Sequence, residues 1–139
     1  MVTTVNKELI IHEVPLKKIS TDGISITIEL DDENEVRWRL VFCPFQDIRI
    51  TTEECYGYSN IPDSEETFAS GRYKRYLLEI HDSERIAQLR TQLVHEHDDF
   101  LVESRHFFMR LGDNMVEIVA WDVEIYKKDE IGIEEFPKE

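Results

Sequence analysis

Alternation of apolar and polar residues over positions 24–42 constrains the fold of this chain more than any other feature of its sequence. Each half of the stretch places apolar residues at every second position: Ile24, Ile26, Ile28 and Leu30, then Val36, Trp38, Leu40 and Phe42. Because successive side chains of a strand point to opposite faces, each half predicts a β-strand with one buried face. The polar residues 31–34 predict a turn, so the two strands are expected to form a hairpin.

Similar alternation, bounded by turn residues, predicts further strands in the rest of the chain. They are an opening strand that ends near Pro15, a short strand over 46–53 after a break or bulge at Pro44, a strand over 72–81, and a hairpin over 106–129 with its turn at 112–114. In the last strand the apolar residues change parity between Ile118 and Trp121. A β-bulge near Ala120 would restore the register and bend the strand, which is typical of a strongly curved sheet.

The segment 83–94 has helical rather than strand periodicity. Ile86, Leu89 and Leu93 lie on its single apolar stripe, and Asp82 or Ser83 precedes it as an N-cap. A single stripe predicts a helix that packs on the sheet with one side. The sequence therefore predicts a mostly-β α+β fold: a curved antiparallel sheet or partial barrel of about seven strands with one covering helix.

The chain has 139 residues and no linker, so we expect a single globular domain over 1–139. The stretch 53–71 lacks periodicity and is rich in acidic residues, glycine and proline, which predicts a long surface loop. The segment 129–139 is expected to be a frayed tail.

The charge of the chain is strongly negative and limits its partners. Thirty Asp and Glu oppose sixteen Lys and Arg, giving a formal net charge of −14. Such a field repels nucleic acid and anionic membranes, so neither is expected as a partner, whereas a basic protein is. An alternative is that the acidic residues only keep the protein soluble.

The cysteines and the N-terminal residues indicate a cytoplasmic protein. Cys43 and Cys55 are too few for a disulfide framework, and their spacing fits no zinc motif. Residues 1–18 carry neither a signal peptide nor a membrane span. No glycine-rich phosphate loop is present, so no cofactor is expected. Either a monomer or a homodimer is compatible with the sequence.

One short run, "HEHDD", combines residue types that ligate metals. It contains His95, His97, Asp98 and Asp99. The H-x-H-x-D spacing resembles part of the metallo-β-lactamase motif, whose His and Asp ligands imply a dinuclear zinc centre. The resemblance covers three positions, and Asp99 and Phe100 stand where a further His is required. The run also follows a helical segment, and the chain is too short for that fold, so we exclude the family.

An isolated metal site at the same run is an alternative, since imidazole and carboxylate bind divalent cations in many arrangements. It would need His81 or His106 within ligand distance of His95 and His97. The competing interpretation is a helix terminus, where histidines interact favourably with the last carbonyl groups.

Carboxylates and aromatic rings gather in the acidic loop. They are Glu53, Glu54, Asp63, Glu65 and Glu66, with Tyr56, Tyr58 and Phe68. Carboxylates steer a basic partner, and aromatic side chains supply most of the binding energy of many interfaces. Acidic bacterial immunity proteins that neutralise basic toxic enzymes use the same physical principle. The loop is therefore a candidate partner-binding site, and a solvated surface loop is its alternative.

The stretch "GRYKRY" is the basic and aromatic counterpart of that loop. Arg72, Lys74 and Arg75, with the intervening tyrosines, could bind a nucleotide or an anionic peptide. Alternatively, the arginines of the sheet pair with Glu29 and Glu79 on a solvated face.

We therefore expect a non-catalytic acidic interaction protein, such as an inhibitor or immunity factor for a basic partner. A metal-binding protein or metal-dependent hydrolase centred on His95 and His97 is one alternative. A small-ligand-binding curved sheet, with Trp38 and Trp121 lining a pocket, is another, although the parity of both tryptophans favours the core.

Overall fold

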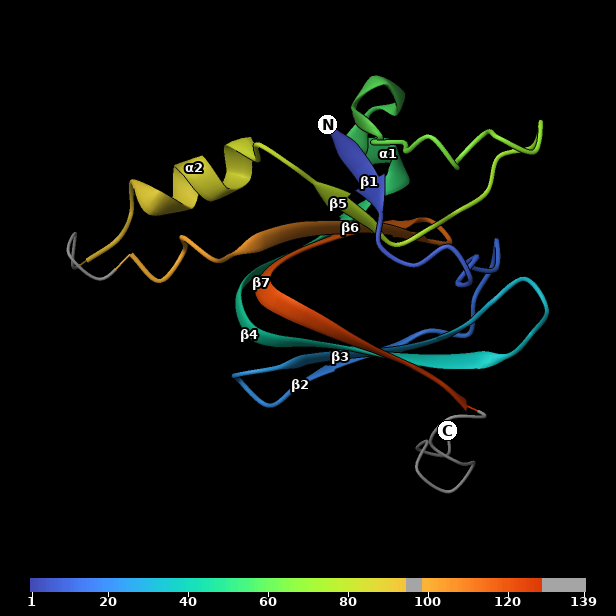
Figure 1. Cartoon of the computed structure of the whole chain (residues 1–139), viewed down its shortest axis with the longest axis horizontal. Coiled ribbons are helices and arrows are strands. Elements are labelled where there is room, and N and C mark those ends of the chain that lie inside the picture. The colour runs from blue at the N-terminus through green and yellow to red at the C-terminus, as the bar shows by residue number, and fades with distance from the viewer. Residues whose placement is uncertain (95–98, 129–139) are drawn as a thin grey trace.

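The computed structural model describes residues 1–94 and 99–128. Its seven strands form an antiparallel open sheet in the order β1-β5-β6-β7-β4-β3-β2 (Figure 1). The strands are β1 (Val2–Thr4), β2 (Lys18–Thr21), β3 (Ile26–Asp31), β4 (Arg37–Thr52), β5 (Leu78–Ile80), β6 (Arg105–Leu111) and β7 (Asn114–Lys127). The helices in the described part are α1 (Glu53–Tyr56), α2 (Glu84–Arg90) and the 3-10 turn η1 (Tyr58–Asn60). The predicted mostly-β α+β fold class is confirmed.

The two longest strands, β4 and β7, bend sharply and divide the sheet into two halves that face each other (Figure 1). The lower half-sheet consists of β2, β3, the first half of β4 and the second half of β7. The upper half-sheet consists of β1, β5, β6 and the remaining halves of β4 and β7. The register shifts between Phe45 and Asp47, opposite Ala120 and Val119. The irregularity expected near Ala120 is therefore present there, but the extra residue belongs to β4.

Pro44 does not end its strand, contrary to one of the two outcomes that the sequence allowed. The Cys43–Pro44 peptide bond is cis, and β4 continues through it to Thr52. Strand β3 pairs with β4 only as far as Phe42, so beyond that residue β4 has β7 as its partner on one side. A proline is tolerated at such an edge because no neighbouring strand needs its missing N–H.

The hydrophobic core fills the space between the two half-sheets. The lower half-sheet contributes the predicted inward residues of the hairpin: Ile26, Ile28, Leu30, Trp38, Leu40 and Phe42. The upper half-sheet contributes Leu77, Phe107, Met109, Leu111, Val116, Ile118 and Ala120. The Phe42 and Phe107 rings meet edge to face at 5.2 Å, so β4 and β6 contact each other across the core. Ile24 is 63% exposed because it lies in the turn before β3, so its predicted burial was wrong.

A second, smaller core lies on the outer face of the upper half-sheet. Leu78, Phe108 and Met115 form it, and Tyr56 and Ile61 pack against them from the segment that follows β4. Helix α1 and the residues after it therefore cover the outside of β5, β6 and β7.

A short segment around Ile11 links the open ends of the half-sheets. Ile11 forms isolated bridges to Arg75, next to the upper half-sheet, and to Asp32, at the end of β3. The predicted opening strand is reduced to this contact, which we call the seam. Strands β1 and β2 were not predicted, and the strand expected over 72–81 is limited to β5.

Helix α2 is shorter than predicted and does not cover the sheet. Ser83 caps it by accepting a hydrogen bond from the backbone N–H of Ile86 at 3.1 Å, as its sequence indicated. The helix ends at Arg90, none of its residues is buried, and Figure 1 shows it extending to the side of the sheet. The apolar stripe of Ile86 and Leu89 is only half-buried, and Ser83, which precedes the helix, joins it to β6 through His106. Within residues 1–94 and 99–128, no helix has the length and apolar character required to cross a membrane.

Candidate functional site

The acidic stretch 53–71 is held in place by buried polar contacts. The hydroxyl groups of Thr4 and Ser64 lie 2.6 Å apart, and the backbone N–H of Ser64 donates to Thr67 Oγ1 at 2.9 Å. Ser64 and Thr67 are both buried, and the N–H of Lys74 donates to the carbonyl of Thr67 at 2.8 Å. These contacts fix the backbone of the stretch and therefore the positions of its surface residues.

The structure separates the eight predicted partner-binding residues into two groups. Five are exposed to solvent: Glu54, Tyr58, Asp63, Glu65 and Phe68. The other three have partners within the fold. Glu53 accepts from Arg110 at 2.8 Å, Tyr56 packs in the second core, and Glu66 lies 3.8 Å from Lys7.

The exposed aromatic residues gather around Arg110. Phe68 and Tyr73 meet edge to face at 5.4 Å, and the Arg110 guanidinium lies 5.5 Å from the Tyr73 ring centre. Burial lowers the pKa of Arg110, but Tyr73, Glu53 and Tyr58 outweigh it, so the net shift is upward. In the sequence Tyr73 belongs to the basic stretch "GRYKRY". Its contact with Phe68 could not be predicted there, because that contact depends on the tertiary fold.

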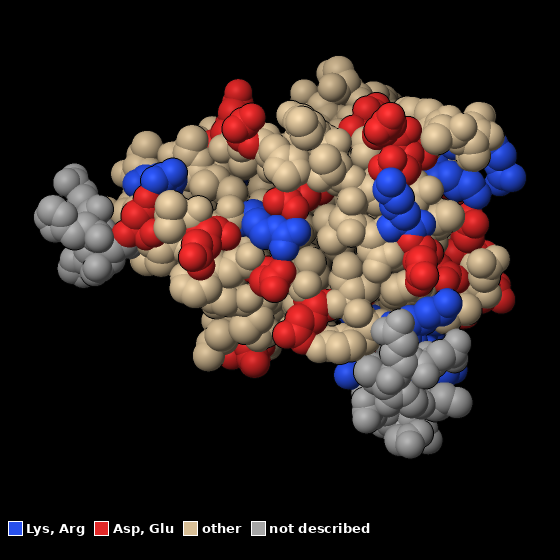
Figure 2. Space-filling view, in the orientation of Figure 1, with Lys and Arg blue, Asp and Glu red and all other residues tan. Residues whose placement is uncertain are grey.

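We call the combined set the acidic-aromatic surface. Its members are Glu54, Tyr58, Asp63, Glu65, Phe68 and Tyr73. Tyr58 is 78% exposed and Phe68 is 55% exposed. Figure 2 shows acidic side chains in separate groups on one face of the molecule, with basic groups beside several of them. The aromatic rings therefore belong to a protein whose surface is broadly negative.

A buried polar network joins α2 to the upper half-sheet. The imidazole of His106 lies between Ser83 Oγ, 2.6 Å from Nδ1, and Glu117 Oε1, 2.9 Å from Nε2. Arg49 approaches Glu117 from β4 at 3.3 Å. Burial alone would raise the pKa of Glu117, but His106 and Arg49 hold it below its usual value. Burial and the Glu117 carboxylate raise the pKa of Tyr56 to about 12.

This network was not identified from the sequence, because its residues come from separate elements with no motif spacing. Its imidazole nitrogens both have partners, and Ser83 also caps α2. A hollow of about 350 Å³ lies beside His106 and Glu117, but its wall includes Arg49 and Arg85, which already pair with Glu117 and Asp47. We therefore assign the network a structural role.

The metal-site hypothesis gains no support from the described residues. His95, His97 and Asp98 lie outside them, and Asp99 pairs with Arg90. No group of three or more potential ligands occurs within 1–94 and 99–128.

The other histidines that the metal hypothesis needed have different partners. His81 Nε2 lies 2.8 Å from Thr3 Oγ1, and His106 is held in the buried network. The hydrogen-bond partners of His81 and His106 are therefore not residues of the predicted metal cluster.

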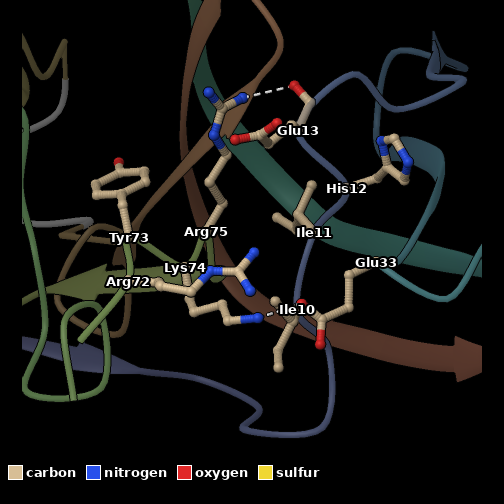
Figure 3. Close-up of a pocket in the computed structure, with 9 residues that line it drawn as sticks. All are labelled: Ile10, Ile11, His12, Glu13, Glu33, Arg72, Tyr73, Lys74 and Arg75. Carbon is tan, nitrogen blue, oxygen red and sulfur yellow. Dashed lines mark hydrogen bonds and ion pairs between the residues drawn. The ribbon is translucent and has the colours of Figure 1, made fainter. Parts of the chain in front are cut away.

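The three predicted anion-binding residues come together at the seam. Arg72, Lys74 and Arg75 border what we call the basic hollow, lined by residues 10–13, Glu33 and 72–75 (Figure 3). Tyr73 points away from Arg72 and Lys74 in Figure 3, and Tyr76 packs against the second core. The cations are therefore clustered, but the tyrosines do not provide a stacking platform beside them. Arg39 pairs with Glu29 at 3.7 Å, but Glu29 is buried, so this pair does not lie on the solvated face that the alternative interpretation expected.

The two tryptophans do not line a common pocket. Trp38 is 2% exposed and donates its Nε1–H to Asp32 at 2.9 Å. Trp121 is 38% exposed and donates to the carbonyl of Phe100 at 2.7 Å. Trp38 thus has the core position that its parity predicted, whereas the core placement of Trp121 was wrong because the strand bends before it.

Comparison with known proteins adds no functional information. No family model and no curated protein matches the chain. A solved structure of an uncharacterized protein from Neisseria gonorrhoeae is similar, with a TM-score of 0.46 and 12% sequence identity. The similarity covers 90% of this chain and 96% of that chain. No residue role is transferred from it.

Proposed function

We propose that this protein is a non-catalytic interaction domain that binds a basic protein partner through the acidic-aromatic surface. The observation that carries the proposal is the exposure of Tyr58 and Phe68 on a segment whose backbone is fixed by Ser64 and Thr67. Large aromatic side chains at a protein surface are typical of interface hot spots.

Two physical effects would act together at this surface. The net charge of −14 attracts a basic partner and accelerates the encounter. Tyr58, Phe68 and Tyr73 would then be desolvated at the centre of the contact, with Glu54, Asp63 and Glu65 at its rim. Because the segment is already held, little conformational entropy is lost on binding.

The partner class that fits best is a basic protein that the cell must neutralise, such as a toxic enzyme whose substrate is itself anionic. An acidic inhibitor occupies a basic substrate site by charge complementarity, and no catalytic group is needed for that function. The two exposed thiols, Cys43 and Cys55, are compatible with a reducing compartment.

The proposal is tested by capturing partners from the native cell with the wild-type protein, followed by affinity measurements with the purified partner. We expect a basic protein whose association slows as salt is raised. Tyr58→Ala and Phe68→Ala should each weaken binding by about 2 kcal/mol, the usual threshold of a hot spot.

Val102→Ala is the matched control, since Val102 is 69% exposed but lies outside the acidic-aromatic surface. It should leave the affinity unchanged. The proposal fails if the captured proteins are acidic, if salt has no effect on association, or if the two aromatic variants bind as tightly as the control.

A further inference from the structure

We propose that the basic hollow at the seam is a binding site for a phosphate group. The inference is independent of the acidic-aromatic surface and concerns the residues 72–75 and 10–13 that face each other in Figure 3. The hollow has a volume of about 190 Å³. A water molecule occupies about 30 Å³ in the liquid, so there is room for a tetrahedral oxyanion.

The cations of the hollow are incompletely neutralised. Arg72 is exposed, and no hydrogen bond or ion pair joins it to any residue in 1–94 or 99–128. Lys74 Nζ lies 2.6 Å from Glu33. Arg75 donates through Nη1 to the carbonyl of Glu13 at 2.7 Å, and the Glu13 carboxylate, which also lines the hollow, offsets part of its charge.

Arg75 also leaves a donor unused inside the protein. Its Nε is buried and has no hydrogen-bond partner among the described residues. Burial and the nearby charge of Arg110 lower the pKa of Arg75, against the opposing charges of Tyr73, Glu13 and Glu53. Because solvent does not reach this Nε, an anion in the hollow would accept from Arg72, from Lys74 and from other nitrogens of the Arg75 guanidinium.

The number of these donors favours phosphate over carboxylate. Arg72, Lys74 and Arg75 contribute separate donors to the lining of the hollow, and His12 belongs to the same lining. The Nδ1 atom of His12 accepts from the N–H of Val14 at 3.0 Å, so neutral imidazole carries its hydrogen on Nε2. A carboxylate has two coplanar oxygens, whereas a phosphate monoester offers three that point in different directions, and guanidinium groups bind it through paired hydrogen bonds.

The base of a nucleotide should add nothing to this recognition. Tyr73 points away from Arg72 and Lys74 and contacts Phe68 instead. The phosphate group itself is therefore the recognised chemistry, whether it is free or carried by a small ester.

The site is tested by titrating the full chain with inorganic phosphate, glycerol phosphate and adenosine monophosphate, followed by amide NMR shifts. Residues 10–13 and 72–75 should respond to all three, with dissociation constants on the order of 1 mM or below. Adenosine monophosphate should bind no more tightly than glycerol phosphate. A clearly tighter nucleotide would overturn the assignment of phosphate as the recognised group.

Two substitutions with opposite expected effects make the test specific. Arg72→Gln should weaken phosphate binding by about tenfold, the loss of one charge-assisted contact. This variant should melt like the wild type, because Arg72 holds no contact in the fold. Glu33→Gln should strengthen binding several-fold, because Glu33 competes with the anion for Lys74.

Arg90→Gln removes the same charge from α2 and is the matched control, with an expected change of less than about twofold. The proposal is overturned if phosphate at about 20 mM shifts no amide of the hollow. It is also overturned if Arg90→Gln weakens binding as much as Arg72→Gln, which would indicate a general charge effect.

Discussion

Replacing Glu117 with alanine is expected to destabilise the protein by about 3 kcal/mol. The Glu117 carboxylate is buried and accepts from His106 Nε2 at 2.9 Å. His106 is only 4% exposed, and no other described residue accepts from its Nε2–H once the carboxylate is gone. The substitution therefore leaves a buried donor without a partner at the centre of the upper half-sheet.

The magnitude follows from the contacts that are lost. A hydrogen bond to a charged acceptor contributes about 1.5–3 kcal/mol. The ion pair with Arg49 adds less than about 1 kcal/mol, because the Arg49 side chain is 45% exposed and screened by solvent. Glu117→Gln keeps an acceptor oxygen for His106 and should cost only about 1–2 kcal/mol.

The pH dependence of stability provides an independent check. The pKa of Glu117 in the folded protein lies below the ordinary value of 4.5 for a glutamate. Its contribution is thus fully present above about pH 4.5 and is lost as the pH falls through the lower pKa of the folded state. In Glu117→Gln this part of the acid destabilisation should be absent.

Urea denaturation at pH 7 and between pH 5 and pH 2 measures both effects. Glu103→Gln is the control, since Glu103 is exposed and its substitution removes the same charge. If Glu117→Ala is as stable as Glu103→Gln, or if the acid limb of Glu117→Gln matches that of the wild type, the reasoning about the buried network is refuted.

Three further outcomes are expected. Ser83→Ala should cost about 1–2 kcal/mol and speed hydrogen exchange of the α2 amides, because the side chain caps the helix at Ile86; unchanged exchange would contradict this. Tyr56, with a pKa of about 12, should ionise after an unperturbed tyrosine, so its contribution to stability is present below pH 10 and decreases towards pH 12; ultraviolet titration of Tyr56→Phe should lack the late phase. Phe42→Ala should lower the free energy of unfolding by about 3–5 kcal/mol in urea, since its buried ring contacts both half-sheets, and a loss below about 1 kcal/mol would be inconsistent with that packing.

The part of the fold that the sequence predicted is the part determined by local pattern. The hairpin of β3 and β4 and the hairpin of β6 and β7 have strict alternation and polar turns, and both are present. Strands β1 and β2 were missed because they are short edge strands, and three or four residues carry too little periodicity. Helix α2 was predicted too long, since Leu93 continues the spacing although the helix ends at Arg90.

The candidate sites were predictable only where composition was informative. The acidic loop and the basic run are visible as clusters in the sequence, and the three basic residues line one hollow in the structure. The sequence could not show that Glu53 and Tyr56 turn inwards, or that Tyr73 leaves its basic neighbours for Phe68. Those outcomes depend on Arg110 and on the second core, which belong to distant strands.

The bent strands β4 and β7 also have a consequence for how the molecule folds and unfolds. The paired strands β4 and β7 run through both half-sheets, so unfolding of one half-sheet disrupts the strand pair on which the other depends. The residues that pair are far apart along the chain, and such contacts form slowly because a long loop must close first. We therefore expect a single cooperative unfolding transition. In a chain cut between the two strands, the edge of β4 that faces β7 would be unpaired. That apolar edge would be prone to aggregation until β7 is supplied.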